Sequence, residues 1–136
     1  MILQIATAVF ALTLTLSAAH AAEPIPVKVV IVTMFETGAD SGDDAGEFQR
    51  WNERQKLDTV FPAPHMHHDI HFNKDTGVLG IVTGMGTANA AASVMALGLD
   101  PRFDLSKSYW LVAGISGFDP EDASLGSVAW AEYLVD

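Results

Sequence analysis

The stretch that decides the fold lies at residues 78–98 and reads VLGIVTGMGTANAAASVMALG. Its first six residues are mostly β-branched or apolar, which is typical of a strand buried on both faces of a sheet. Gly84 and Gly86 interrupt this run. The alanine-rich residues 87–97 then predict a helix, which Gly98 is expected to end in the left-handed C-cap conformation. A strand followed directly by a helix is the repeating unit of an α/β sheet.

The rest of the chain continues this alternation of strands and helices. Further strands are predicted at residues 27–34, 68–72, 109–113 and 127–135. The turn-forming residues 73–77 predict that the second of these strands pairs with the strand at 78–83 as a hairpin. A short helix is expected to carry Phe48 and Trp51 on one face, with Asp43 or Asp44 as its N-cap.

The predicted class is therefore α/β, with a central mixed sheet. Such a sheet must be covered on both faces, because its strands are apolar on both sides. The sequence supplies two convincing helices for this purpose, and its last predicted strand runs to the terminal residues. We therefore expect residues 22–136 to be the N-terminal half of a larger, truncated domain.

The charge distribution separates the first 21 residues from the remainder. No charged side chain occurs before Glu23, and residues 5–16 form an apolar run that a small-x-small site follows at residues 19–21. This layout predicts a signal peptide at residues 1–21 and a secreted or periplasmic location. The net charge of −10 excludes a nucleic-acid-binding surface. No later apolar run approaches the roughly 20 residues of a membrane span, so none is expected in the mature chain.

Glycine-rich sequences stand at the ends of several predicted strands. One is Gly84-Met85-Gly86, and another is Gly114-Ile115-Ser116-Gly117. A third strand ends at Thr33-Met34-Phe35-Glu36. Ligands of open α/β sheets bind outside the carboxyl ends of the strands, and a helix N-terminus offers N–H groups to an anion or a polar oxygen. These three ends are expected to converge on one crevice that holds a small polar ligand.

The same sequences carry a resemblance to a known family. Residues 83–91 are similar to the Gly-Ile-Gly-x-x-Asn-Ala-Ala element of the nucleoside phosphorylase and nucleosidase superfamily, and residues 113–117 with Leu125-Gly126 resemble its next element. From about Pro26 onward, the chain resembles the purine nucleoside permease family more closely. The stretches that carry this closer resemblance are residues 55–59, 67–69, 77–84, 97–104 and 121–124.

The resemblance implies a nucleoside phosphorylase-like three-layer fold, a purine nucleoside ligand and a role in nucleoside transport across a membrane. It points to eight substrate-binding residues: Glu36, Thr83, Gly84, Gly86, Asn89, Gly114, Ser116 and Gly117. Ile115 stands where phosphorylases usually place a hydroxyl, and the resemblance implies that the catalytic acid belongs to the later half of the domain, so no catalytic residue is assigned. The alternative function is that of an exported purine nucleosidase or nucleoside phosphorylase. A cofactor is not expected, and an unidentified membrane transport protein is a possible partner.

Histidines are concentrated in one short segment, residues 65–71. In an extended strand His67, Asp69 and His71 share a face, which allows a third function, that of a metal-binding module. The chain has no cysteine to supply the thiolates of a structural zinc site. The sequence therefore predicts that no metal is required, and that these side chains lie on a solvated rim or contact the ligand.

The sequence predicts structural rather than functional roles for two further groups of residues. Acidic residues are expected to form a solvated loop: Asp40, Asp43, Asp44 and Glu47. Aromatic residues are expected to pack in the core rather than stack on a base: Phe48, Trp51 and Phe61.

Overall fold

The computed structural model describes residues 22–133, which form a mixed α/β fold. The strands are β1 (Ile25–Pro26), β2 (Val29–Thr33), β3 (Thr59–Phe61), β4 (Ile70–Asn73), β5 (Val78–Val82), β6 (Phe103–Asp104) and β7 (Tyr109–Val112). The helices are α1 (Gln49–Gln55) and α2 (Thr87–Gly98). The predicted signal peptide, residues 1–21, lies outside the described residues.

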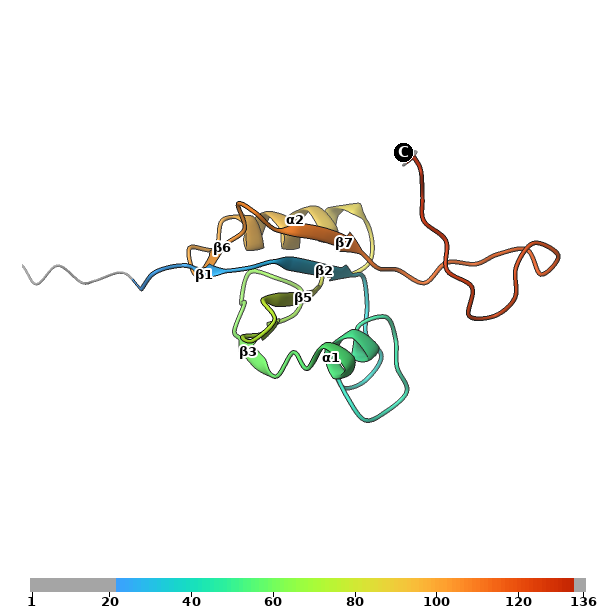
Figure 1. The fold of residues 1–136 in the computed structure, drawn as a ribbon, viewed down its shortest axis with the longest axis horizontal. Helices are drawn as coiled ribbons and strands as arrows, with labels where there is room; N and C mark the ends of the chain where they lie inside the picture. The colour runs from blue at the N-terminus through green and yellow to red at the C-terminus, as the bar shows by residue number, and fades with distance from the viewer. Residues whose placement is uncertain (1–21, 134–136) are drawn as a thin grey trace, which may run out of the picture.

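The main sheet has five strands in the order β3-β4-β5-β2-β7 (Figure 1). The central strand β2 runs parallel to β5 on one side and to β7 on the other. The hairpin of β4 and β5 is antiparallel, as predicted, and β3 extends it. The sheet is therefore mixed, and the carboxyl ends of β2, β5 and β7 lie at one edge.

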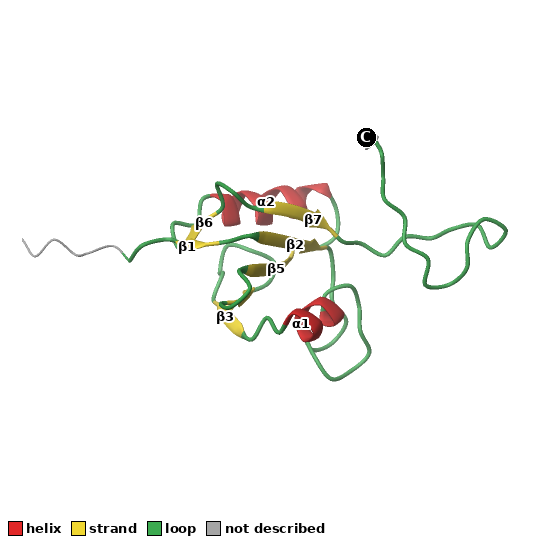
Figure 2. Ribbon diagram, viewed as in Figure 1, coloured by secondary structure: helices red, strands yellow, loops and turns green. Residues whose placement is uncertain are grey.

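The two helices cover opposite faces of this sheet (Figure 2). On the α2 face, Leu97 joins a cluster with Val30, Val32, Leu79 and Ile81, all of which are buried. On the other face, next to α1, a second cluster contains Phe48, Leu57 and Val82. The alternation of side chains along β5 explains this division, since successive residues point to opposite faces.

The structure corrects two predicted helix ends. Gly98 is the last residue of α2 rather than a left-handed cap, and Leu99 follows it with a φ of −97°. Neither Asp43 nor Asp44 caps α1, because the N-cap position is Phe48, whose own side chain makes no capping hydrogen bond. Asp43 instead accepts a hydrogen bond from the Ala39 N–H within its own loop.

The C-terminal part of the predicted sheet also differs. Residues 127–133 form no strand, and Figure 1 shows the chain after β7 leading away from the sheet. Strand β7 is exposed rather than buried: Tyr109 is 80% exposed and Val112 is 70% exposed. Strand β7 lies at the edge of the sheet with β2 as its one partner among residues 22–133, so its side chains lack the neighbours that bury a central strand. The β-prone composition of residues 127–133 is not sufficient by itself to pair them with that edge.

We expect Gly80→Val to lower the free energy of unfolding by about 2 kcal/mol, because it overpacks the α1 face. A Cβ at this position would lie 2.7 Å from Leu57 Cδ1 and 2.8 Å from Phe48 Cε2. Gly98→Ala is the matched control. It meets no heavy atom within 4 Å and sits in a helix, so it should raise the same free energy by about 0.5–1 kcal/mol. Urea unfolding measures both changes, and a Gly80→Val protein as stable as the parent would contradict the packing described here.

Candidate functional site

Glu47 joins the ends of β2 and β7. Its two carboxylate oxygens accept hydrogen bonds from the N–H of Met34, just after β2, at 2.7 Å and from the N–H of Ile115, just after β7, at 2.9 Å. The side chain is buried, which corrects the expectation that Glu47 belongs to a solvated loop. Gly114 fits against the end of the Met34 side chain, where any Cβ would collide with Met34 Cε.

The ends of β2 and β5 are held together by two buried threonines. The Thr33 hydroxyl donates to the carbonyl of Ile81 at 3.0 Å, and the Thr83 N–H donates to the carbonyl of Thr33 at 2.9 Å. The hydroxyl of Ser93, on α2, donates to the Thr83 carbonyl at 2.9 Å. Since the Thr83 hydroxyl is itself buried and donates to the Gly84 carbonyl at 2.9 Å, its described contacts are internal.

The link between β5 and α2 leaves the start of the helix open. Gly84 and Gly86 have positive φ values of 81° and 90°, and no side chain caps the helix at Gly86. A Cβ on Gly86 would meet no heavy atom within 4 Å, so the space beside it is free for a ligand. The Asn89 amide donates to the Met85 carbonyl at 2.8 Å and holds this link. The first-turn N–H groups of a 12-residue helix therefore face an accessible edge.

Glu36 organises the loop between β2 and α1. Its carboxylate accepts hydrogen bonds from the backbone N–H groups of Thr37, Gly46 and Gln49. Partial burial raises the pKa of Glu36, but the backbone donors together outweigh that effect and hold the pKa below its ordinary value. Gln49 is the first residue of α1, so Glu36 supplies the capping interaction that was expected of Asp43 or Asp44.

The eight predicted binding residues thus fall into separate groups. Thr83, Gly84, Gly86 and Asn89 lie together at the β5–α2 link. Gly114 lies at the end of β7, joined to β2 through Glu47. Glu36 supports the adjoining loop. Ser116 and Gly117 are exposed and line a hollow formed by residues 116–127 of the segment that follows β7. Sequence reasoning missed Glu47, because only the fold shows that its partner Ile115 is close.

The structure does not bring His67, Asp69 and His71 together as the sequence predicted. His67 lies against Gly84, and Asp69 accepts a hydrogen bond from the Ala63 N–H at 2.9 Å. Two other histidines meet Asp40 instead. His68 Nε2 lies 3.0 Å from Asp40 Oδ1, and His71 Nε2 lies 3.2 Å from Asp40 Oδ2. Asp40 is therefore not simply a solvated acid, and the structure replaces the set of His67, Asp69 and His71 by Asp40, His68 and His71.

His71 is buried, which corrects its placement on a solvated rim. Burial lowers the pKa of His71, while the neighbouring Asp40 carboxylate opposes this and the His68 ring adds to it, so the pKa lies below the ordinary value. The edge of the His71 ring packs against Phe48, with ring centroids 5.2 Å apart and an interplanar angle of 83°. Phe48 is fully buried, and Phe61 packs against the α2-face cluster, as predicted for core aromatics.

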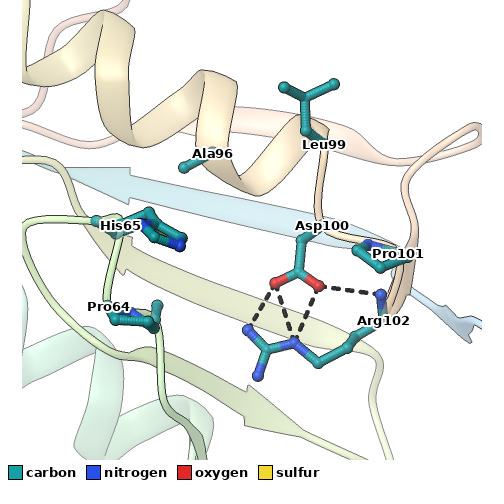
Figure 3. Close-up of a pocket in the computed structure, with 9 residues that line it drawn as sticks. Pro64, His65, Ala96, Leu99, Asp100, Pro101 and Arg102 are labelled. Atoms are coloured by element: carbon teal, nitrogen blue, oxygen red, sulfur yellow. Dashed lines mark hydrogen bonds and ion pairs between the residues drawn. The ribbon is translucent and has the colours of Figure 1, made fainter.

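A separate pocket of about 450 Å³ lies at the other end of α2 (Figure 3). Ala96, Leu99 and Pro101 give it an apolar wall. Its charged residues, Asp100 and Arg102, bond to one another at 2.6 Å, and the Arg102 guanidinium lowers the pKa of Asp100. The Asp100–Arg102 pair is internally satisfied, and His65 is the other polar side chain of the lining, so the pocket offers few of the convergent polar contacts that a nucleoside requires.

The family model and the two relatives described here carry the same family description. The family model described as purine nucleoside permease (NUP) matches residues 26–136. A probable purine nucleoside permease of Schizosaccharomyces pombe is 37% identical over 109 residues, which cover 80% of this chain and 30% of that protein. A purine nucleoside permease of Candida albicans is 38% identical over 108 residues, covering 79% of this chain and 25% of that protein. No solved structure is significantly similar.

Proposed function

We infer a role in purine nucleoside transport for this chain, which belongs to the purine nucleoside permease family. The observation that carries this proposal is the family match over residues 26–136, at 37–38% identity to two proteins named as purine nucleoside permeases. The chain spans 25–30% of the length of these two relatives. None of the helices within residues 22–133 has the length and apolar character needed to cross a lipid bilayer.

We propose that the nucleoside binds at the carboxyl ends of β2, β5 and β7. Three features support this location. The strand ends are fixed to one another through Glu47 and through the Thr33 and Thr83 backbone. The glycines of the β5–α2 link permit close backbone approach, and the start of α2 presents N–H groups to ribose or base oxygens. Asn89 supplies a side-chain amide beside them.

The remaining parts of the proposal concern fold relationship and location. We propose a nucleoside phosphorylase-like arrangement, which is supported by the mixed sheet and by the glycine-rich link that leads into α2. We also propose that residues 1–21 direct export, because they are uncharged and contain a short apolar run before a small-residue site. The exported domain would bind the nucleoside and deliver it to a membrane transport protein.

Direct binding tests the proposed site. Isothermal titration calorimetry of the full chain with inosine and adenosine should show saturable heats, whereas uridine and cytidine, which lack the purine ring, should give weaker binding. Equal binding of purine and pyrimidine nucleosides would contradict purine recognition. If neither class bound, the proposed nucleoside site at the carboxyl ends of β2, β5 and β7 would be wrong. The same samples, with and without phosphate, are assayed for released base. Release of free base would show that the chain cleaves the glycosidic bond, and this activity would then take the place of the proposed transport role.

A chimera tests the transport role independently of the isolated chain. Residues 26–133 would replace the matching segment of the Candida albicans purine nucleoside permease, and uptake of radiolabelled adenosine would be measured in cells. Uptake should persist with this segment and fall when it carries a substitution at the β5–α2 link. If a normally expressed chimera with the unmodified segment took up no adenosine, this would contradict a role in transport shared by the two proteins.

A further inference from the structure

We propose that Asp40, His68 and His71 form a binding site for a single divalent transition metal ion, for which zinc is the best match. One atom from each of the three side chains lies within 4.8 Å of the other two. Asp40 comes from the loop after β2, His68 from the segment before β4, and His71 from β4 itself. The site is independent of the proposed nucleoside contacts, and it reverses the expectation from the sequence that no metal is required.

The hydrogen bonds around each imidazole determine which ring nitrogen faces Asp40 as an acceptor. His71 Nδ1 lies 3.1 Å from Asn52 Oδ1, and the Asn52 amide is oriented by donating from Nδ2 to the Asp40 backbone carbonyl at 2.9 Å. His71 Nδ1 must therefore carry the hydrogen. His68 Nδ1 lies 3.0 Å from the backbone carbonyl of Asp69, which can only accept, so this nitrogen also carries its hydrogen.

With their hydrogens on Nδ1, both rings direct Nε2 at the Asp40 carboxylate. Contacts of 3.0 Å and 3.2 Å between Nε2 and a carboxylate oxygen are favourable when a positive charge lies between the two atoms, either a proton on Nε2 or a metal ion. We assign that role to a metal ion, because one ion can bridge all three side chains at once. Neutral imidazoles whose Nδ1–H groups bond to a carbonyl or amide oxygen, with Nε2 free to coordinate, have the arrangement that orients histidine ligands in metal sites.

The spacing also fits a metal ion of suitable size. Bonds of about 2.0 Å from zinc to nitrogen or oxygen in tetrahedral geometry place neighbouring ligand atoms about 3.3 Å apart. The shortest nitrogen–oxygen separations in the cluster are 3.0 Å from His68 Nε2 to Asp40 Oδ1 and 3.2 Å from His71 Nε2 to Asp40 Oδ2. Two imidazoles with one carboxylate favour zinc and similar transition ions over magnesium and calcium, which prefer oxygen ligands. Three protein ligands leave one position of a tetrahedron for water.

The position of the cluster gives the ion a structural effect. Asp40 lies in the long loop between β2 and α1, while His71 lies opposite Gly80 in the antiparallel pairing of β4 and β5. A bound ion would therefore attach this loop to the sheet, beside the buried ring of Phe48. Binding that requires the folded loop stabilises the folded protein by mass action.

Zinc titration of the untagged full chain, after chelator treatment and dialysis, tests the proposal. We expect calorimetry to show one bound equivalent of Zn²⁺, and the melting temperature to be higher with Zn²⁺ than with Mg²⁺. The X-ray absorption spectrum at the zinc edge should report two imidazole ligands and an oxygen ligand. Asp40→Asn and His68→Ala each remove a ligand at a partly exposed position and should weaken zinc binding at least tenfold. Asn52→Ala removes the hydrogen bonds that orient His71 and the Asp40 backbone, and should weaken zinc binding about 10–100-fold.

The other two histidines within residues 22–133 provide the matched control. A protein carrying His65→Ala and His67→Ala should bind zinc as the parent does, because neither of these residues belongs to the cluster. Failure to bind one equivalent would overturn the proposal. Undiminished binding by both Asp40→Asn and His68→Ala would also overturn it, as would competition by Mg²⁺ at equal concentration.

Discussion

Glu47→Ala is expected to destabilise the protein by about 3 kcal/mol or more and to abolish nucleoside binding at the carboxyl ends of the strands. Hydrogen bonds to charged groups contribute about 1.5–3 kcal/mol each, and this substitution removes two of them. It also leaves the N–H groups of Met34 and Ile115 without the carboxylate that joins them. Because these two N–H groups directly follow β2 and β7, the substitution releases the segments that leave the two paired strand ends and that form part of the proposed site.

Two variants separate this linking role from a general effect of charge. Glu47→Gln keeps the shape of the side chain and one carbonyl oxygen, so it can still accept from one of the two N–H groups and should lose about half as much stability. Glu121→Ala removes an exposed carboxylate away from the strand ends and should change stability by less than about 0.5 kcal/mol. Urea unfolding gives all three values. Equal stability of Glu47→Ala and Glu121→Ala would show that Glu47 does not stabilise the segments that follow β2 and β7.

The sequence predicted those elements whose signals are local. The hairpin of β4 and β5 and the helix α2 follow from patterns contained in about 30 consecutive residues, and the structure confirms them. Strands β1 and β6 have only two residues each, too few to give a periodic pattern, although they pair with one another. The strand expected at residues 127–135 has the composition of a strand, but composition does not provide the neighbouring strand that pairing requires.

The candidate site was harder to predict because its key contacts join distant parts of the chain. The glycines at 84 and 86 were identified correctly as a break between a strand and a helix. Glu47 and Asp40 lie in a segment rich in acids and glycines, which is typical of a solvated loop. Their partners Ile115, His68 and His71 are separated from them by 28 or more residues, so only the folded chain reveals these contacts.

Gly86→Val is expected to weaken purine nucleoside binding at least tenfold, or about 1.4 kcal/mol, with a smaller effect on the rest of the fold. Gly86 has a φ of 90° and a ψ of 153°, a region of backbone conformation that is essentially restricted to glycine. A valine would strain the link into α2. It would also fill the open space next to the first turn of the helix, where the ligand is proposed to lie.

Gly42→Val is the matched control for this last prediction, because it imposes backbone strain without touching the strand ends. Gly42 also has a positive φ, 83°, and a Cβ there would likewise meet no heavy atom within 4 Å. Both variants should lose some stability in urea unfolding, since a strained backbone conformation at positive φ costs a non-glycine residue about 1–3 kcal/mol. Only Gly86→Val should lose affinity in calorimetry with inosine. Equal affinities of the two variants would exclude the β5–α2 link from the nucleoside site, because strain would be present in both and blockage in only one.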